Sequence, residues 1–101
     1  MSEHRVAFKS DVPEGGAIAV DVLDRRIAIF RHGEGFFALD ETCPHRGAPL
    51  HEGTLDRGVV ICPWHQWQFR LDNGCSPVNP ASKVAVYPLR FEGDAIIVEV
   101  S

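Results

Sequence analysis

Apolar residues alternate with polar ones along much of the chain, and this period of two is typical of half-buried β-strands. The alternation is clearest at 18–22, 27–29 and 96–100. Turn signals separate such runs, including Asp-Asn-Gly at 72–74 and Glu-Gly-Asp at 92–94. No window of useful length shows the 3.6-residue period of a helix, and seven prolines and nine glycines would interrupt one. The sequence therefore predicts a nearly all-β fold of successive hairpins.

Two segments interrupt the strand pattern. Residues 42–50 and 62–67 are loops that contain Cys and His, residue types that bind metals. Each loop follows a predicted strand, 36–40 for the first loop and 59–61 for the second. A scaffold of hairpins would therefore present the two loops side by side.

The length and the charge of the chain limit the classes of function that it can have. With 101 residues and no repeat or linker, the chain is expected to form a single domain over 1–101. The formal net charge is −4 and no cluster of Lys and Arg is present, which argues against binding to nucleic acid. The longest apolar runs are far shorter than the roughly 20 residues of a membrane-spanning helix. Because the N-terminal residues also lack the apolar core of a signal peptide, we expect a cytoplasmic protein with no membrane partner.

The cysteines point to metal ligation, because three of them are too few for a disulfide framework. Cys43 and His45 stand in the first loop, and Cys62 and His65 stand in the second. This set would satisfy tetrahedral Zn²⁺, although zinc fingers usually group Cys with Cys and His with His. The alternating order suits a two-iron cluster, with each loop donating its Cys to one iron and its His to the other. A zinc-stabilised β module that only binds a partner remains an alternative.

The two loops, which read CPHRG and CPWH, resemble the cluster loops of the Rieske family. The likeness extends to the residues around both loops and covers essentially the whole chain. It implies antiparallel sheets with two cluster-binding loops at one end. It also implies one [2Fe-2S] cluster per chain, in which Cys43 and Cys62 bind one iron and His45 and His65 bind the other.

Departures from the family pattern allow the reduction potential to be placed within the Rieske range. Rieske potentials run from roughly −150 to +300 mV, above the roughly −400 mV of plant-type ferredoxins. Ala48, Trp64, Trp67 and Phe69 stand where respiratory Rieske proteins carry disulfide cysteines and hydroxyl donors to the cluster. With fewer donors, we expect a potential near the low end, in a chain that resembles the ferredoxins of bacterial ring-hydroxylating oxygenase systems. Gln66 replaces a common Gly and is expected to change the local backbone modestly.

The resemblance implies a monomeric one-electron carrier, not an enzyme, between a flavin-dependent reductase and an oxygenase or other oxidoreductase. A small subunit of an oxidoreductase, similar to that of assimilatory nitrite reductase, is the alternative. A terminal oxygenase would need a mononuclear iron held by two His and a carboxylate, and His4, His32 and His51 lack that clustered spacing. The sequence also lacks a G-x-G-x-x-G fingerprint for NADH or flavin, so the electrons must come from a partner.

The remaining expectations concern single residues. Cys75 is expected to be a small buried thiol, and His51 a surface residue near the cluster. Trp67 and Phe69 should share one face and pack beneath the cluster. The loop residues at the cluster end are expected to form a small docking patch for redox partners. These residues are Arg46, Pro49, Leu50, His51, Trp64 and Gln66.

Overall fold

The computed structural model describes residues 2–33, 35–42, 49–63, 67–78 and 82–100. Within these ranges the regular elements are ten strands and two short 3-10 helices. In chain order they are β1 (Ser2–Phe8), η1 (Lys9–Asp11), β2 (Ala17–Val22), β3 (Arg25–His32), β4 (Gly35–Asp40), η2 (Leu50–Glu52), β5 (Thr54–Asp56), β6 (Val59–Ile61), β7 (Gln68–Arg70), β8 (Val86–Tyr87), β9 (Leu89–Glu92) and β10 (Ala95–Val100).

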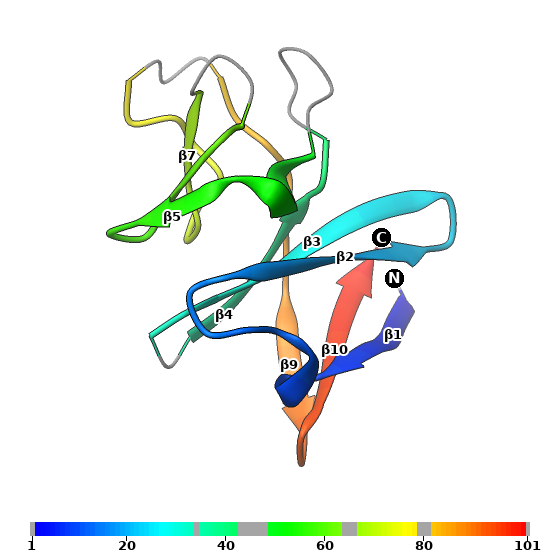
Figure 1. Cartoon of the computed structure of the whole chain (residues 1–101). Coiled ribbons are helices and arrows are strands. Elements are labelled where there is room, and N and C mark those ends of the chain that lie inside the picture. The colour runs from blue at the N-terminus through cyan, green and yellow to red at the C-terminus, as the bar shows by residue number, and fades with distance from the viewer. Residues whose placement is uncertain (1, 34, 43–48, 64–66, 79–81, 101) are drawn as a thin grey trace.

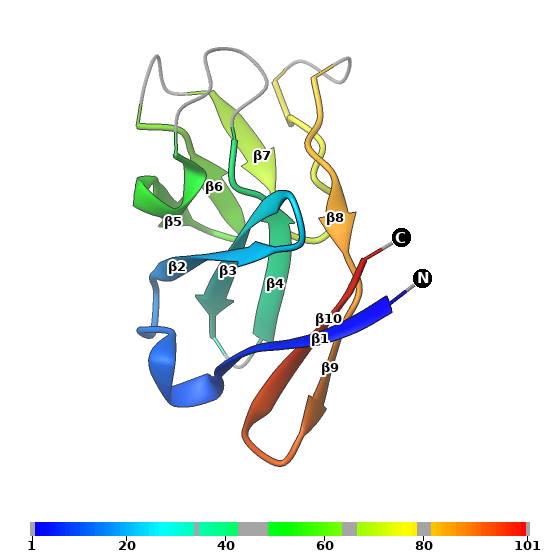
Figure 2. The same ribbon diagram turned by 90° about the vertical axis from the view of Figure 1, so that its right-hand side faces the viewer.

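The strands form three antiparallel sheets, with strand orders β1-β10-β9, β2-β3-β4-β8 and β5-β6-β7 (Figures 1 and 2). Each predicted strand that followed the period of two lies in one of them. The segments 18–22, 27–29 and 96–100 fall in β2, β3 and β10, while 36–40 and 59–61 fall in β4 and β6. The prediction of a nearly all-β fold is confirmed. None of the helices in the described ranges is long and apolar enough to span a membrane.

The sheet β2-β3-β4-β8 lies between the other two sheets, and both of its faces are covered. On β3, Ala28 and Phe30 belong to one hydrophobic cluster, which also contains residues of β6 and β7. Ile27 and Ile29 belong to a second cluster, which also contains residues of β10. Side chains of a strand alternate between its faces, so β3 contributes to two cores at once. The β5-β6-β7 sheet packs on one face of this central sheet. The first predicted ligand loop follows β4 of the central sheet, and the second follows β6.

Candidate metal centre

Of the four predicted ligands, Cys62 is described by the structure, whereas Cys43, His45 and His65 lie outside the described residues. Cys62 directly follows β6, and it is only 1% exposed. The described residues on either side of both ligand loops reach the same end of the molecule (Figures 1 and 2). The described flanks of both loops therefore lie at one end of the fold.

The ends of the first ligand loop are held together at its base. Thr42 and Pro49 form an isolated antiparallel bridge, and the Leu50 backbone N–H donates to the Glu41 carbonyl oxygen at 2.7 Å. The backbone N–H of His51 donates to Glu41 Oε1 at 2.8 Å. The second carboxylate oxygen, Oε2, pairs with the ring Nδ1 of His51. Four contacts therefore join the residue pair that precedes the loop to the three residues that follow it.

The second ligand loop is closed by the hairpin of β6 and β7. Val60 pairs with Phe69 in this hairpin, and Ile61 pairs with Gln68. Beyond the paired residues, the Cys62 backbone N–H donates to the Trp67 carbonyl oxygen at 2.6 Å. The antiparallel pairing thus continues up to the predicted ligand and fixes its backbone.

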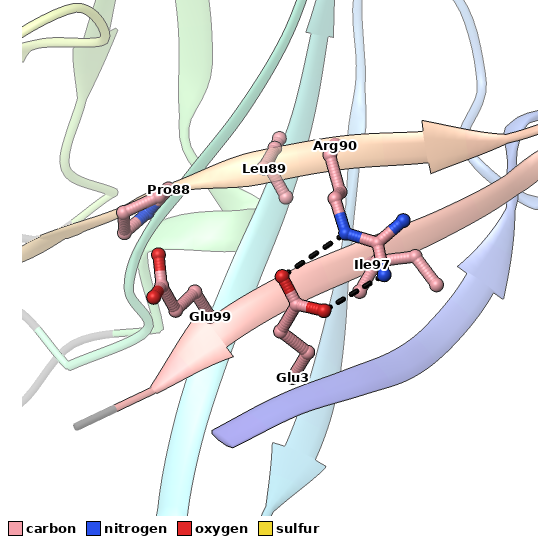
Figure 3. A pocket seen from close by; sticks show the side chains of 6 residues that line it. All are labelled: Glu3, Pro88, Leu89, Arg90, Ile97 and Glu99. Atoms are coloured by element: carbon pink, nitrogen blue, oxygen red, sulfur yellow. Dashed lines mark hydrogen bonds and ion pairs between the residues drawn. The ribbon is translucent and has the colours of Figure 1, made fainter. Parts of the chain in front are cut away.

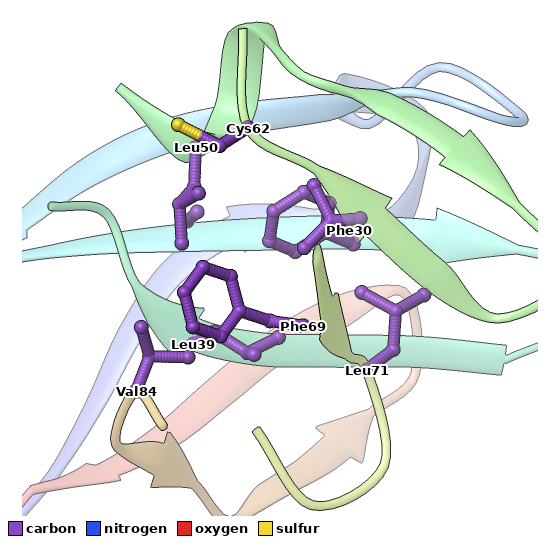
Figure 4. Close-up of a cluster of buried hydrophobic side chains, with 9 residues drawn as sticks. Phe30, Leu39, Leu50, Cys62, Phe69, Leu71 and Val84 are labelled. Atoms are coloured by element: carbon purple, nitrogen blue, oxygen red, sulfur yellow. The ribbon is translucent and has the colours of Figure 1, made fainter. Parts of the chain in front are cut away.

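A buried hydrophobic cluster contains residues from the flanks of both ligand loops. It contains Leu50 from η2, Cys62 and Phe69 (Figure 4). Trp67 is partly buried and packs against this cluster. The expectation that Trp67 and Phe69 share one apolar face is therefore confirmed. The thiol of Cys62 lies at the edge of an apolar core, shielded from bulk water.

The predicted docking patch needs one correction, because Leu50 is 0% exposed. The 3-10 helix η2 turns its side chain into the core that contains Cys62. The sequence interpretation placed Leu50 in the docking patch because it belongs to the first ligand loop, near the histidines expected to bind the outer iron. The next residue, His51, keeps 29% of its side chain exposed, so the prediction that it lies near the surface beside the first ligand loop holds in part.

Gly53 brings the two loops together at the level of the backbone. Its N–H donates to the Leu50 carbonyl oxygen at 2.9 Å, and the following residue, Thr54, pairs with Ile61. A Cβ at Gly53 would lie 2.3 Å from the Ile61 carbonyl oxygen, closer than real Cβ contacts occur. The exit of the first loop and the strand leading to Cys62 therefore approach each other so closely that a side chain cannot fit between them.

The substitution Gly53→Ala should lower the free energy of unfolding by about 2 kcal/mol, because η2 or β6 must move to admit a methyl group. Thermal unfolding followed by circular dichroism would measure the loss. Gly58→Ala is a suitable control: its φ of 79° is unfavourable for Ala, but a Cβ there meets open space. The control should cost only about 1 kcal/mol. A Gly53→Ala protein as stable as wild type would show that the two backbones can separate freely.

A polar network supports the end of β4, just before the first ligand loop. Tyr87 Oη donates to Asp40 Oδ1 at 2.6 Å and accepts from Arg25 Nη1 at 3.2 Å. Burial raises the pKa of Tyr87, and the hydrogen bond to Asp40 raises it further. The same contact with Tyr87 raises the pKa of Arg25. Tyr87 therefore stays neutral and joins β8 to β4 beneath the loop.

The structure also describes Cys75, His4 and His32. Cys75 is half-buried, not fully buried as expected, and its backbone N–H donates to Asn73 Oδ1 at 2.9 Å. His4 is half-exposed and its ring hydrogen-bonds with Ser2 Oγ at 2.8 Å, while His32 is exposed.

A shallow pocket on the sheet β1-β10-β9 is dominated by an ion pair (Figure 3). Arg90 Nη2 and Nε contact the two carboxylate oxygens of Glu3 at 2.7 and 3.0 Å. The hydrogen bond from Arg90 holds the pKa of Glu3 below its ordinary value, and Glu3, followed by Glu92, raises the pKa of Arg90. All three side chains are well exposed, so the pair is a feature of the solvated surface.

Sequence reasoning missed Glu41, which is only 3% exposed. A glutamate beside a polar loop is ordinarily solvated, and Glu is almost never fully buried unless it is paired. Its partner, His51, is ten residues away in the sequence and lies across the ligand loop. The sequence feature that could have indicated this pair is a carboxylate before the loop and a histidine after it.

Comparisons with known proteins agree with this architecture. The model of the Rieske [2Fe-2S] domain matches residues 2–88. The 3-phenylpropionate/cinnamic acid dioxygenase ferredoxin subunit of Shigella flexneri is 37% identical over 93 residues, which cover 90% of this chain and 87% of that protein. The ferredoxin component of the alkene monooxygenase system of Xanthobacter autotrophicus is 34% identical over 95 residues, which cover 92% of this chain and 77% of that protein.

Solved structures show the same fold. A chain from the complex of reduced oxygenase and oxidized ferredoxin in carbazole 1,9a-dioxygenase superposes with a TM-score of 0.86 at 30% identity, covering 95% of this chain and 91% of that chain. A structure described as an NADH-dependent nitrite reductase small subunit from Mycobacterium tuberculosis has a TM-score of 0.89 at 28% identity, covering 99% of this chain and 96% of that chain. The prediction of antiparallel sheets of this type is confirmed.

Proposed function

This chain belongs to the Rieske [2Fe-2S] domain family, and we propose that it is the ferredoxin component of an oxygenase system. It is an electron carrier with one [2Fe-2S] cluster, so the zinc alternative is set aside. In the proposed role it takes one electron at a time from a flavin-dependent reductase and delivers it to an oxygenase in the cytoplasm. The supporting observation is that the likeness to a ferredoxin subunit covers 90% of this chain and 87% of that protein.

We assign the cluster ligands as the two thiolates of Cys43 and Cys62 on one iron and the two imidazoles of His45 and His65 on the other. The described residue of this set fits the group: Cys62 is a buried thiol directly after β6, at the start of the second ligand loop. A bound metal deprotonates a coordinating thiol outright, so burial does not prevent ligation. The cluster, once bound, supplies a centre that gains and loses a single electron.

The residues behind Cys62 lower the reduction potential in this proposal. Leu50, Val60 and Phe69 are fully buried and apolar, and they keep water away from the inner side of the site. Neither Phe69 nor Trp67 carries a hydroxyl that could donate to a cluster sulfur. A dry environment with fewer donors disfavours the added negative charge of the reduced state. The potential should therefore lie near the low end of the Rieske range.

Electrons should enter and leave at the end of the molecule that bears the ligand loops, because His45 and His65 would bind the outer iron there. The docking patch is proposed without Leu50 and is kept small, as is usual for transient redox complexes. The formal net charge of −4 would attract a basic partner and speed encounter, an effect that salt weakens. The carrier is proposed to act as a monomer. The patch residues are Arg46, Pro49, His51, Trp64 and Gln66.

A second candidate function is that of a small subunit bound permanently to a larger oxidoreductase. The observation that favours it is the TM-score of 0.89 with the structure described as a nitrite reductase small subunit. Purification from the native source distinguishes the two roles. A large partner that stays bound at high salt would favour the subunit, whereas a monomer reduced by a separate reductase would favour the free carrier.

The proposed cofactor makes a direct prediction. The purified protein should be reddish brown and, after reduction, should give a rhombic EPR signal with an average g below the free-electron value, because the two irons have different ligands. Iron and acid-labile sulfide should both be present at two per chain, as a [2Fe-2S] cluster requires. A colourless protein with stoichiometric zinc and no labile sulfide, even after anaerobic reconstitution, would contradict the proposal.

A further inference from the structure

We propose that Glu41 and His51 form a clamp that positions the first ligand loop relative to the strand carrying Cys62. The inference rests on the ligand assignment of the proposed function, because the loop between the two clamp residues contains Cys43 and His45. Neither Glu41 nor His51 is proposed as a ligand. Both are positioning residues, which act on the cluster through the loop that they close.

The burial of Glu41 calls for a reason. Among the described residues it is the only charged side chain that is buried. Burying a carboxylate is costly unless hydrogen bonds compensate it, and buried ion pairs often contribute no more stability than apolar residues of the same size. Their best-attested role is to specify one arrangement among several. The Glu41–His51 pair is therefore better explained by a role in fixing the position of the ligand loop than by a contribution to the stability of the fold.

The contacts of Glu41 fix its position on both sides. Its backbone N–H donates to the Arg26 carbonyl oxygen at 3.0 Å, which ties it to β3 in the central sheet. Its two carboxylate oxygens meet the backbone N–H and the ring Nδ1 of His51. Two contacts on one residue restrict both the place of the His51 backbone and the orientation of its ring. The central sheet thereby defines where the loop must end.

His51 connects Glu41 to the residues that place the second ligand loop. It is the middle residue of η2, directly after Leu50, which packs in the same core as Cys62. Two residues later, the backbone at Gly53 lies against the Ile61 carbonyl oxygen, one residue before Cys62. A displacement of His51 would therefore move η2 against the residues that place Cys62. The clamp controls the relative position of the two loops, and with it the geometry of ligands drawn from both.

Three variants of Glu41 separate hydrogen bonding from packing. Glu41→Gln keeps an oxygen that accepts the His51 backbone N–H and offers an amide N–H to the ring nitrogen. Glu41→Leu fills a similar volume but offers no polar contact. Glu41→Ala removes both the side-chain volume and the polar contact. In the holoprotein, Glu41→Leu and Glu41→Ala should lose the cluster to a chelator about tenfold faster than wild type, a typical effect of losing support around a metal site. Glu41→Gln should remain close to wild type.

Two further measurements report on the site itself. The EPR g values and the reduction potential of the retained cluster should shift in Glu41→Leu and return toward wild type in Glu41→Gln. His51→Asn, whose amide nitrogen can take the place of Nδ1, should behave like Glu41→Gln. His51→Ala loses the ring contact but keeps the backbone N–H that donates to Glu41, so it should lie between wild type and Glu41→Leu. The double variant Glu41→Ala/His51→Ala should be no worse than Glu41→Ala alone, because the change at Glu41 already removes the ring contact that His51→Ala would remove.

The matched control is the exposed ion pair of Glu3 and Arg90 on the opposite sheet (Figure 3). Glu3→Leu makes the same chemical change and should alter none of these readouts. The clamp is overturned if Glu41→Leu matches wild type in cluster loss, EPR spectrum and potential, since volume alone would then suffice. A wild-type protein without an iron-sulfur EPR signal would overturn the proposed function, whereas a normal wild-type signal with unaltered variants overturns the clamp alone.

Discussion

Replacing Leu50 with glutamate should destabilise the protein by at least about 4 kcal/mol, and lower its unfolding temperature by roughly 20 °C. Leu50 is 0% exposed and packs with Cys62 and Phe69. The change removes a buried apolar side chain and places a carboxylate in a core with no partner for it. Because typical domains are stable by only about 5–15 kcal/mol, this loss would be a large part of the total stability. Circular dichroism and cluster absorbance during heating would measure the loss.

The same substitution at Leu23 provides a matched control. Leu23 is 73% exposed at the turn between β2 and β3, so Leu23→Glu should change the free energy of unfolding by less than about 0.5 kcal/mol. The experiment also decides between two roles for Leu50. If Leu50→Glu unfolded like wild type but was reduced more slowly by the partner, Leu50 would be a docking residue, and its buried position would be wrong.

Replacing Cys62 with serine should abolish the cluster. The thiolate is the form that binds the metal, and a serine hydroxyl does not ionise comparably near neutral pH. The remaining three ligands would leave one iron with a single thiolate. We expect a colourless protein with little iron, no labile sulfide and no EPR signal after reduction. Iron and sulfide analysis of the protein as isolated, and again after anaerobic reconstitution, would test this.

Cys75→Ser is the control for this change, since Cys75 is half-buried in the turn after β7 and its backbone is held by Asn73. The control should keep its full iron content and an unchanged spectrum. A result in the opposite sense, with the cluster lost from Cys75→Ser and kept in Cys62→Ser, would show that the wrong thiol had been assigned.

The strands could be predicted because their signal is local. The alternation at Ile18, Val20 and Val22 appeared in β2, and the run at 59–61 appeared in β6. The period of two could not reveal that β3 is buried on both faces, with Ala28 and Phe30 as inaccessible as Ile27 and Ile29. Whether a second face is covered depends on which distant strands pack against it. Here those strands are β6 and β7 on one side and β10 on the other.

The residue types of the candidate site were also readable from the sequence alone. Metal ligation depends on the chemistry of Cys and His and on their short spacing, so the two loops could be found in the sequence by itself. The family and the cofactor followed from the resemblance of these loops to those of the Rieske family. Tertiary structure decided which neighbours of those ligands are buried. It turned Leu50 into the core through η2, and it joined Glu41 to His51 across the loop. Burial and pairing depend on how segments distant in sequence meet, and the local pattern of polar and apolar residues does not contain that information.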